Sequence, residues 1–127
     1  MTDRMPSVLI VEDNCEMREM IKFALIKRKY TVFEAENGKE AILKFKPTLT
    51  DMVITDLLMP DEDGLAVIMK LKQIKPELRV IAISGGGKVG PGSYLSIAKT
   101  LGADAIFHKP FSTQQLCEKV DELMVKV

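Results

Sequence analysis

Val8-Leu9-Ile10-Val11 is an unbroken apolar run, and two acids, Glu12 and Asp13, follow it directly. An apolar run of this length is typical of a strand that is buried on both faces of a parallel sheet. Comparable β-type runs recur along the chain, at residues 30–35, 51–55, 79–84 and 105–107. Longer stretches with helical spacing separate them. This alternation of five βα units predicts an α/β fold with a doubly wound, five-stranded parallel sheet covered by helices on both faces.

The helices are expected near residues 14–29, 38–46, 65–75, 93–101 and 112–127. Their apolar stripes are formed by Met17, Met20, Ile21, Ala24 and Leu25 in the first helix and by Leu65, Ile68, Met69 and Leu71 in the third. Ser112-Thr113-Gln114-Gln115 has a capping-box pattern and opens the last helix. Residues 56–64 are expected to form a loop, and residues 85–92, with five glycines and a proline, a flexible one.

The length and the charge limit the classes of protein to which the chain can belong. Its 127 residues fit a single domain, and 18 basic residues balance 18 acidic ones. Proteins that bind mainly nucleic-acid phosphates or anionic membranes need a basic excess, so both classes are excluded. The longest apolar run, residues 65–69, is too short to cross a bilayer, and the N-terminus has no secretory pattern. Cys15 and Cys117 fit free thiols, so we expect a cytoplasmic protein.

Charged and hydroxyl side chains stand directly after four of the predicted strands. Glu12 and Asp13 follow the first strand, Asp56 the third, Ser84 the fourth and Lys109 the fifth. Ligands of such sheets bind at the carboxyl ends of the strands, so these side chains are expected to meet there. Clustered carboxylates repel one another, and a hard cation such as Mg²⁺ relieves that repulsion. The ammonium and the hydroxyl suit two oxygens of a phosphoryl group.

Each of these residues taken singly also has a structural interpretation. Asp13 fits a helix cap, and Asp56 fits a residue of the loop that follows its strand. Lys109 fits a solvated lysine at a turn, and Ser84 fits a hydroxyl at the end of a strand. The functional interpretation is favoured because all of them follow strand ends of one sheet.

Several short motifs accompany these residues: residues 8–14, Asn37-Gly38 with Glu40-Ala41, residues 51–56, Met59-Pro60, Asp63-Gly64, Ile83-Ser84, residues 102–104 and Lys109-Pro110-Phe111. Together they resemble the response-regulator receiver domain of two-component signalling, of the chemotaxis-regulator type. The resemblance runs over nearly all of the 127 residues, in order and at similar spacing. It implies a flavodoxin-like (βα)5 fold with strand order 2-1-3-4-5.

The resemblance also implies a role for each residue of the phosphoryl site. Asp56 would accept a phosphoryl group, Ser84 would contact that group, and Lys109 would bridge acid and phosphoryl oxygens. The Lys109-Pro110 peptide bond is expected to be cis, which proline permits at little cost.

A metal site is implied by the same resemblance. It would hold Mg²⁺, for which Mn²⁺ is a substitute. Asp13 and Asp56 would bind the cation directly, Glu12 would act through water, and the backbone carbonyl of Leu58 would supply the third protein ligand.

The chain departs from the family pattern in three places. Ile106 stands where the family usually carries an aromatic switch residue, while Phe107 is expected to face the other side of the sheet. The glycine-rich loop at 85–92 is longer than usual and fits a hinge better than a phosphate cradle. Leu58 and Gly86 stand where side chains commonly tune hydrolysis, and neither is suited to position a water molecule.

Phosphorelay signal transduction through a stand-alone receiver domain, residues 1–127, is the predicted function. A histidine kinase or a phosphotransfer protein is the expected donor, and Asp56 is the acceptor. The output is expected through a downstream protein or a homodimer, at the face formed by residues 93–101, 105–107 and 112–127. Such a switch is not a turnover enzyme, although it assists its own phosphorylation and dephosphorylation. No direct contact with nucleic acid and no membrane insertion are expected.

Three other classes stand as alternatives. A pseudo-receiver would keep the fold as an interaction module without phosphorylation. A flavodoxin-type cofactor binder is disfavoured because Glu12 and Asp13 would repel a flavin phosphate. A phosphohydrolase with Asp56 as nucleophile would place a DxD pair after the first strand, where this chain has Glu12-Asp13-Asn14.

Leu58→Asn tests the expected effect of the apolar residue near the acceptor. The amide is expected to hold the attacking water, so the phosphorylated variant should lose its phosphoryl group faster than the wild type. Following the mass of both phosphorylated proteins over time measures the two decay rates. Equal rates would contradict the assigned role of Leu58.

Overall fold

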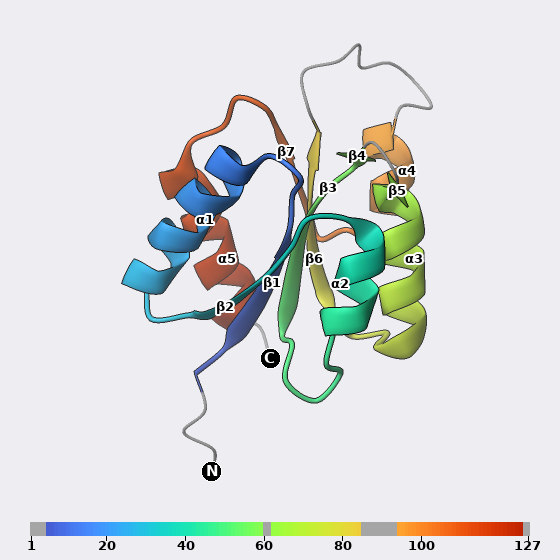
Figure 1. Ribbon diagram of the computed structural model, residues 1–127, viewed down its shortest axis with the longest axis horizontal. Helices are drawn as coiled ribbons and strands as arrows, with labels where there is room; N and C mark the ends of the chain where they lie inside the picture. The colour runs from blue at the N-terminus through green and yellow to red at the C-terminus, as the bar shows by residue number, and fades with distance from the viewer. Residues whose placement is uncertain (1–4, 60–61, 85–93, 126–127) are drawn as a thin grey trace.

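The computed structural model describes residues 5–59, 62–84 and 94–125. Its main sheet has five parallel strands, which are β1 (Ser7–Val11), β2 (Thr31–Ala35), β3 (Met52–Asp56), β6 (Arg79–Ser84) and β7 (Ala105–His108). They lie in the order β2-β1-β3-β6-β7 (Figure 1). Counted along the chain this is the order 2-1-3-4-5, which confirms the predicted doubly wound, flavodoxin-like α/β fold.

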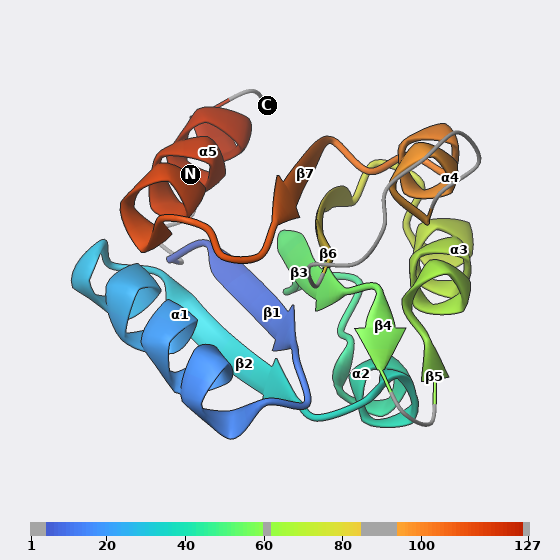
Figure 2. The ribbon, with the colours of Figure 1, turned by 90° about the horizontal axis from the view of Figure 1, so that it is seen from above.

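Helices cover both faces of the sheet, and they are α1 (Cys15–Lys27), α2 (Gly38–Lys44), α3 (Gly64–Ile74), α4 (Tyr94–Thr100) and α5 (Thr113–Val125). Figure 2 shows α1 and α5 on one face and α2, α3 and α4 on the other. None of the helices in the described ranges is long and apolar enough to cross a membrane.

Strand residues alternate between two core layers, one on each face of the sheet. In β1, Val8 and Ile10 pack with α1 and α5, whereas Leu9 and Val11 pack with α2, α3 and α4. Every residue of β1 and of β3 is buried. The central strands are apolar on both faces because both faces are covered, as the continuous apolar runs predict.

Polar caps mark the starts of the first and last helices. Asn14 Oδ1 accepts a hydrogen bond from the backbone N–H of Met17 at 2.8 Å. Ser112 Oγ accepts one from the N–H of Gln115 at 3.1 Å, so the predicted start of the last helix is confirmed. These bonds satisfy N–H groups that the first turn of a helix leaves without an intrahelical partner.

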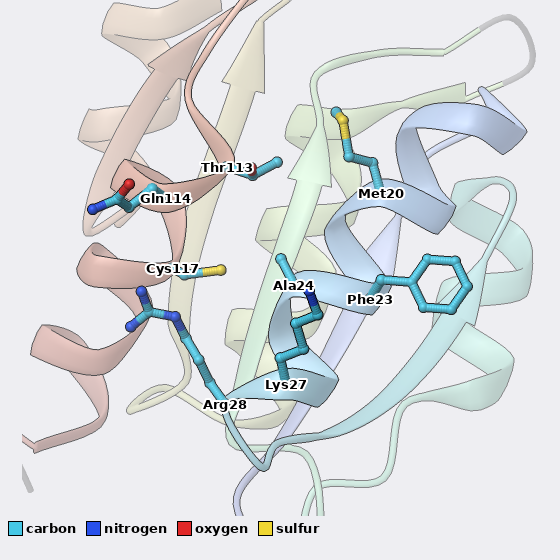
Figure 3. A pocket seen from close by; sticks show the side chains of 8 residues that line it. All are labelled: Met20, Phe23, Ala24, Lys27, Arg28, Thr113, Gln114 and Cys117. Carbon is cyan, nitrogen blue, oxygen red and sulfur yellow. The ribbon is translucent and has the colours of Figure 1, made fainter.

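The buried stripe of α1 is narrower than the sequence predicts. Ile21 and Leu25 are fully buried, but Met20 is 45% exposed. Met20 and the exposed Phe23 line a hollow of about 510 Å³ between α1 and α5 (Figure 3). Met69 of α3, also predicted to be buried, is largely exposed as well. Helical spacing identifies the residues that share a side, but the packing of neighbouring helices sets how wide the covered stripe is.

Residues 56–64, predicted as a loop, contain a short antiparallel hairpin. Its strands are β4 (Leu58–Met59) and β5 (Glu62–Asp63), with Leu58 opposite Asp63. Two-residue strands are too short to show an alternating pattern, so the sequence gives no sign of them. The predicted flexible loop at 85–92, with Gly85 and Gly86, lies outside the described residues, as does Pro60.

A polar cluster ties α5 to the segment that follows α1. The carboxylate of Asp121 accepts a hydrogen bond from the Tyr30 hydroxyl at 2.5 Å and pairs with the Arg28 guanidinium. Burial, and then this hydrogen bond, raise the pKa of Tyr30 well above its ordinary value. The Tyr30 hydroxyl therefore keeps its proton at neutral pH and links residues that are 91 positions apart in the chain.

Gly102 offers a test of the backbone after α4. Its φ is +111°, a conformation that residues with a side chain rarely adopt. Gly102→Ala is expected to lower the free energy of unfolding by about 1–2 kcal/mol through backbone strain. Urea unfolding measures this loss, with Lys99→Ala on the exposed side of α4 as the control. An equal loss in both variants, or none in Gly102→Ala, would contradict the assigned strain.

Candidate functional site

The candidate site lies at the end of the sheet where the five strands terminate. Asp56 and Ser84 are the last residues of β3 and β6, Glu12 and Asp13 follow β1, and Lys109 follows β7. Because β1 and β3 are neighbours in the sheet, the acids from these two strands come side by side. The fold therefore brings the residues singled out in the sequence to one end of the sheet.

Three carboxylates form a compact acidic cluster. Glu12, Asp13 and Asp56 each offer one oxygen, and these atoms all lie within 4.8 Å of one another. Glu12 and Asp56 are buried, whereas Asp13 is exposed. The cluster is thus shielded by the fold at Glu12 and Asp56 and exposed to solvent at Asp13.

Lys109 is the cation that faces this cluster. Its Nζ atom lies 3.2 Å from Asp56 Oδ2 and 3.2 Å from Glu12 Oε1. Burial alone would lower the pKa of Lys109, but the charges of Asp56 and Glu12 outweigh it, so the pKa is raised. Lys109 therefore stays protonated and bridges the acids of two strands.

Glu12 is almost completely buried, and one of its oxygens has no hydrogen bond. Its Oε2 atom accepts the backbone N–H of Asn14 at 3.1 Å. Its Oε1 atom is close enough to Lys109 for an ion pair, but the angles are not those of a hydrogen bond. Burial, and to a lesser degree the charge of Asp56, raise the pKa of Glu12 to about 7.

The donor atoms of the cluster fit a hard divalent cation. Among the described residues, three carboxylates stand against one ammonium, and carboxylate oxygens are the ligands that Mg²⁺ and Mn²⁺ prefer. Glu12 Oε1 is a buried oxygen that can still accept an interaction. The acidic cluster could therefore hold a metal ion of this kind, with access past Asp13.

Two contacts that the sequence did not predict fix the backbone of Asp56 and of Leu57, which follows it. Thr55 Oγ1 donates a hydrogen bond to the Asp56 carbonyl at 3.0 Å. The N–H of Gly64, at the start of α3, donates to the Leu57 carbonyl at 3.1 Å. A Cβ atom on Gly64 would lie 2.6 Å from Leu57 Cα, so any side chain there would displace the backbone at the end of β3. The sequence shows a glycine where the third helix begins, but only the structure shows that its close contact with residues 56 and 57 requires a glycine there.

Ile106 and Phe107 face opposite sides of the sheet, as strand alternation predicts. Ile106 packs against the core layer of α2, α3 and α4, whereas Phe107 packs in the layer of α1 and α5. The Phe107 ring meets Phe111 edge-on, with ring centroids 6.1 Å apart. Ile106 is therefore an aliphatic residue on the side of the sheet that α2, α3 and α4 cover.

The remaining predicted residues lie around the same end of the sheet. Ser84 is buried, and its carbonyl accepts the backbone N–H of Lys109 at 2.8 Å. The Lys109-Pro110 peptide bond is cis. Leu58 begins β4, two residues after Asp56.

Comparison with known proteins identifies the family. The chain matches the response regulator receiver domain over residues 8–121. It is 36% identical over 118 residues to the chemotaxis protein CheY of Bacillus subtilis, covering 92% of this chain and 96% of that protein. It is also 36% identical over 125 residues to the sensor kinase CckA of Brucella abortus, covering 94% of this chain but 13% of the kinase. The chain belongs to the response regulator receiver domain family.

Solved structures show the same fold. A CheY-like response regulator receiver domain protein from Methanospirillum hungatei superposes with a TM-score of 0.88 at 24% identity, covering 97% of this chain and 96% of that one. The family places the chain in two-component signalling, among phospho-accepting switches rather than enzymes.

The raised pKa of Glu12 predicts how stability depends on pH when metal is absent. Between the ordinary value of 4.5 and about 7, the folded state binds this proton and the unfolded state does not. Stability from this group is therefore present at low pH and lost as the pH rises through 7. Glu12→Gln should match the wild type near pH 4 and exceed it by about 3 kcal/mol at pH 8, on the scale of 1.36 kcal/mol per pKa unit.

Urea unfolding across this pH range, with a chelator present, measures the difference. Glu16→Gln is the control, because the Glu16 carboxylate in the first turn of α1 is exposed. A stability difference for Glu12→Gln that stays constant with pH, or that grows toward low pH, would contradict the assignment.

Proposed function

We propose that this protein is a phosphorylation-dependent switch that accepts a phosphoryl group on Asp56 from a phosphohistidine. The donor is a sensor histidine kinase or a histidine phosphotransfer protein. The observation that carries the proposal is the buried Asp56 carboxylate, which lies 3.2 Å from the Lys109 ammonium inside an acidic cluster of a receiver-family chain.

The proposed reaction is an in-line transfer in which a bond forms between an Asp56 carboxylate oxygen and phosphorus. The phosphorus–nitrogen bond of the phosphohistidine breaks, and its electron pair stays on the imidazole nitrogen. Lys109 offers a positive charge to one phosphoryl oxygen, and the Ser84 hydroxyl donates a hydrogen bond to another. The transition state is metaphosphate-like, so these side chains act by placement and charge rather than by proton transfer.

Asp13, Asp56 and the Leu58 carbonyl are the proposed direct ligands of Mg²⁺, or of Mn²⁺ in its place, and Glu12 acts through water. The bound cation supplies charge neutralisation for the phosphoryl oxygens. The proposal is supported by the 4.8 Å cluster of carboxylate oxygens and by the buried Glu12 oxygen that lacks a hydrogen bond.

Redistribution of the Lys109 and Ser84 contacts is the proposed source of the signal. Lys109 now bridges Glu12 and Asp56, and a phosphoryl group on Asp56 would compete for its ammonium. Lys109 directly follows β7, and Ile106 within β7 packs on the face of the sheet that α2, α3 and α4 cover. A shift at this strand would change the face formed by α4, β7 and α5, where a downstream protein or a second copy of the chain would bind.

We also propose that residues 1–127 form a single receiver domain and that this domain works in the cytoplasm. Its balanced charge, 18 basic against 18 acidic residues, supports an output through protein contacts rather than nucleic acid or membrane insertion. Assisted self-phosphorylation and self-dephosphorylation are the only reactions that this proposal assigns to it.

A phosphorylation assay tests the proposal. Incubation with Mg²⁺ and a small acyl phosphate should add the mass of one phosphoryl group to the wild type and to Glu16→Gln, a control with an exposed carboxylate near the site. Asp56→Asn should gain nothing, because an amide cannot form the acyl phosphate. A wild type without mass gain would favour the pseudo-receiver, and an equal gain by Asp56→Asn at the same peptide would overturn the assignment of Asp56.

A further inference from the structure

Arg18 in α1 reaches back to the acidic turn that follows β1. Its Nη1 atom donates a hydrogen bond to the backbone carbonyl of Glu12 at 2.7 Å. Its Nε atom donates to Glu34 Oε1 on β2 at 3.2 Å. The Arg18 side chain is only 11% exposed, so both contacts are made under the surface of the fold.

The Glu12 carbonyl belongs to the peptide group that joins Glu12 to Asp13, so its hydrogen bond affects both acidic residues. A peptide group is planar, so a hydrogen bond to its oxygen fixes the orientation of the whole plane. Rotation of that plane would move the Cα atom of Asp13 and change where its carboxylate points. On the other side, the N–H of Glu12 is held by the Ala35 carbonyl at 3.0 Å.

Arg18 is itself held in place by Glu34, which also pairs with Lys22. Glu34 accepts the Arg18 bond at one oxygen, and its other oxygen lies 3.0 Å from the Nζ atom of Lys22. Burial would raise the pKa of Glu34, but the hydrogen bonds from Lys22 and Arg18 outweigh it and lower the pKa. Glu34 therefore stays ionised and anchors the guanidinium whose other end binds the Glu12 carbonyl.

We propose that Arg18 is a positioning residue for the divalent-cation site, which holds the Glu12–Asp13 peptide so that both carboxylates face Asp56. The inference rests on the proposed function, since it assigns Arg18 a role in the metal site proposed there. Arg18 acts through the backbone and does not itself touch the cation or the phosphoryl group. Groups that orient metal ligands from behind commonly contribute about 10–100-fold to metal affinity.

The test compares Arg18→Met with Lys22→Met, a matched variant that breaks a contact to the same Glu34 without reaching Glu12. The dissociation constant for Mn²⁺, measured by electron paramagnetic resonance, is expected to rise about tenfold in Arg18→Met. Lys22→Met should stay within about twofold of the wild type, because the Glu12 carbonyl keeps its donor. Arg18→Lys, which restores a cationic donor, should recover part of the lost affinity.

Two results would overturn the inference: a dissociation constant for Arg18→Met within twofold of the wild type, or an equal loss in Lys22→Met. Urea unfolding checks that the variants are folded at the assay temperature. Should Arg18→Met fail to fold, Glu34→Gln removes the outer anchor of Arg18 instead, and it must weaken Mn²⁺ binding more than Lys22→Met does.

The same proteins separate this inference from the proposed function. If the wild type binds Mn²⁺ and gains a phosphoryl group, but Arg18→Met has the same Mn²⁺ affinity, only the role of Arg18 is contradicted. If the wild type binds no Mn²⁺, both the proposed metal site and the role of Arg18 are contradicted. At saturating Mn²⁺, phosphorylation of Arg18→Met should return to within about threefold of the wild-type rate, since the defect lies in holding the ion.

Discussion

The interaction on which the site depends is the bridge that Lys109 makes between Glu12 and Asp56. Two buried carboxylates and a third, exposed one lie close enough to repel strongly, and charges removed from water are costly unless they are paired. One ammonium offsets only part of that cost, as the raised pKa of Glu12 shows. The described side chains of the site therefore carry an excess of negative charge, which favours the binding of a divalent cation.

The strand order of the parallel sheet brings these charged side chains together. Neighbouring strands β1 and β3 deliver their acids to adjacent positions, and β7 returns Lys109 to the same end from the far side of β6. Rigid surroundings keep the groups there, since both faces of the central strands are covered and Gly64 leaves room for nothing larger behind Asp56. The backbone at Asp56 is thus fixed, while Asp13 faces solvent.

Much of this molecule can be predicted from its sequence, and the rest depends on tertiary contacts. Apolar runs locate the strands, and residues that follow them, such as Asp56 and Lys109, converge wherever parallel strands end together. The exposure of Met20 could not be predicted, because the packing of α5 decides it. The roles of Gly64 and Arg18 could not be predicted either, since each residue contacts a backbone group outside its own helix. The hairpin of β4 and β5 is too short to leave a pattern.

The contact of Tyr30 and Arg28 with Asp121 has a consequence for how the molecule opens. It joins the first βα unit to the last helix across nearly the whole length of the chain. Fraying of α5 as far as Asp121 would break both contacts with the segment between α1 and β2, so these contacts oppose local opening of the helix. We therefore expect amide protons of α5 near Asp121 and of the connection between α1 and β2 to become exchangeable in a shared opening event.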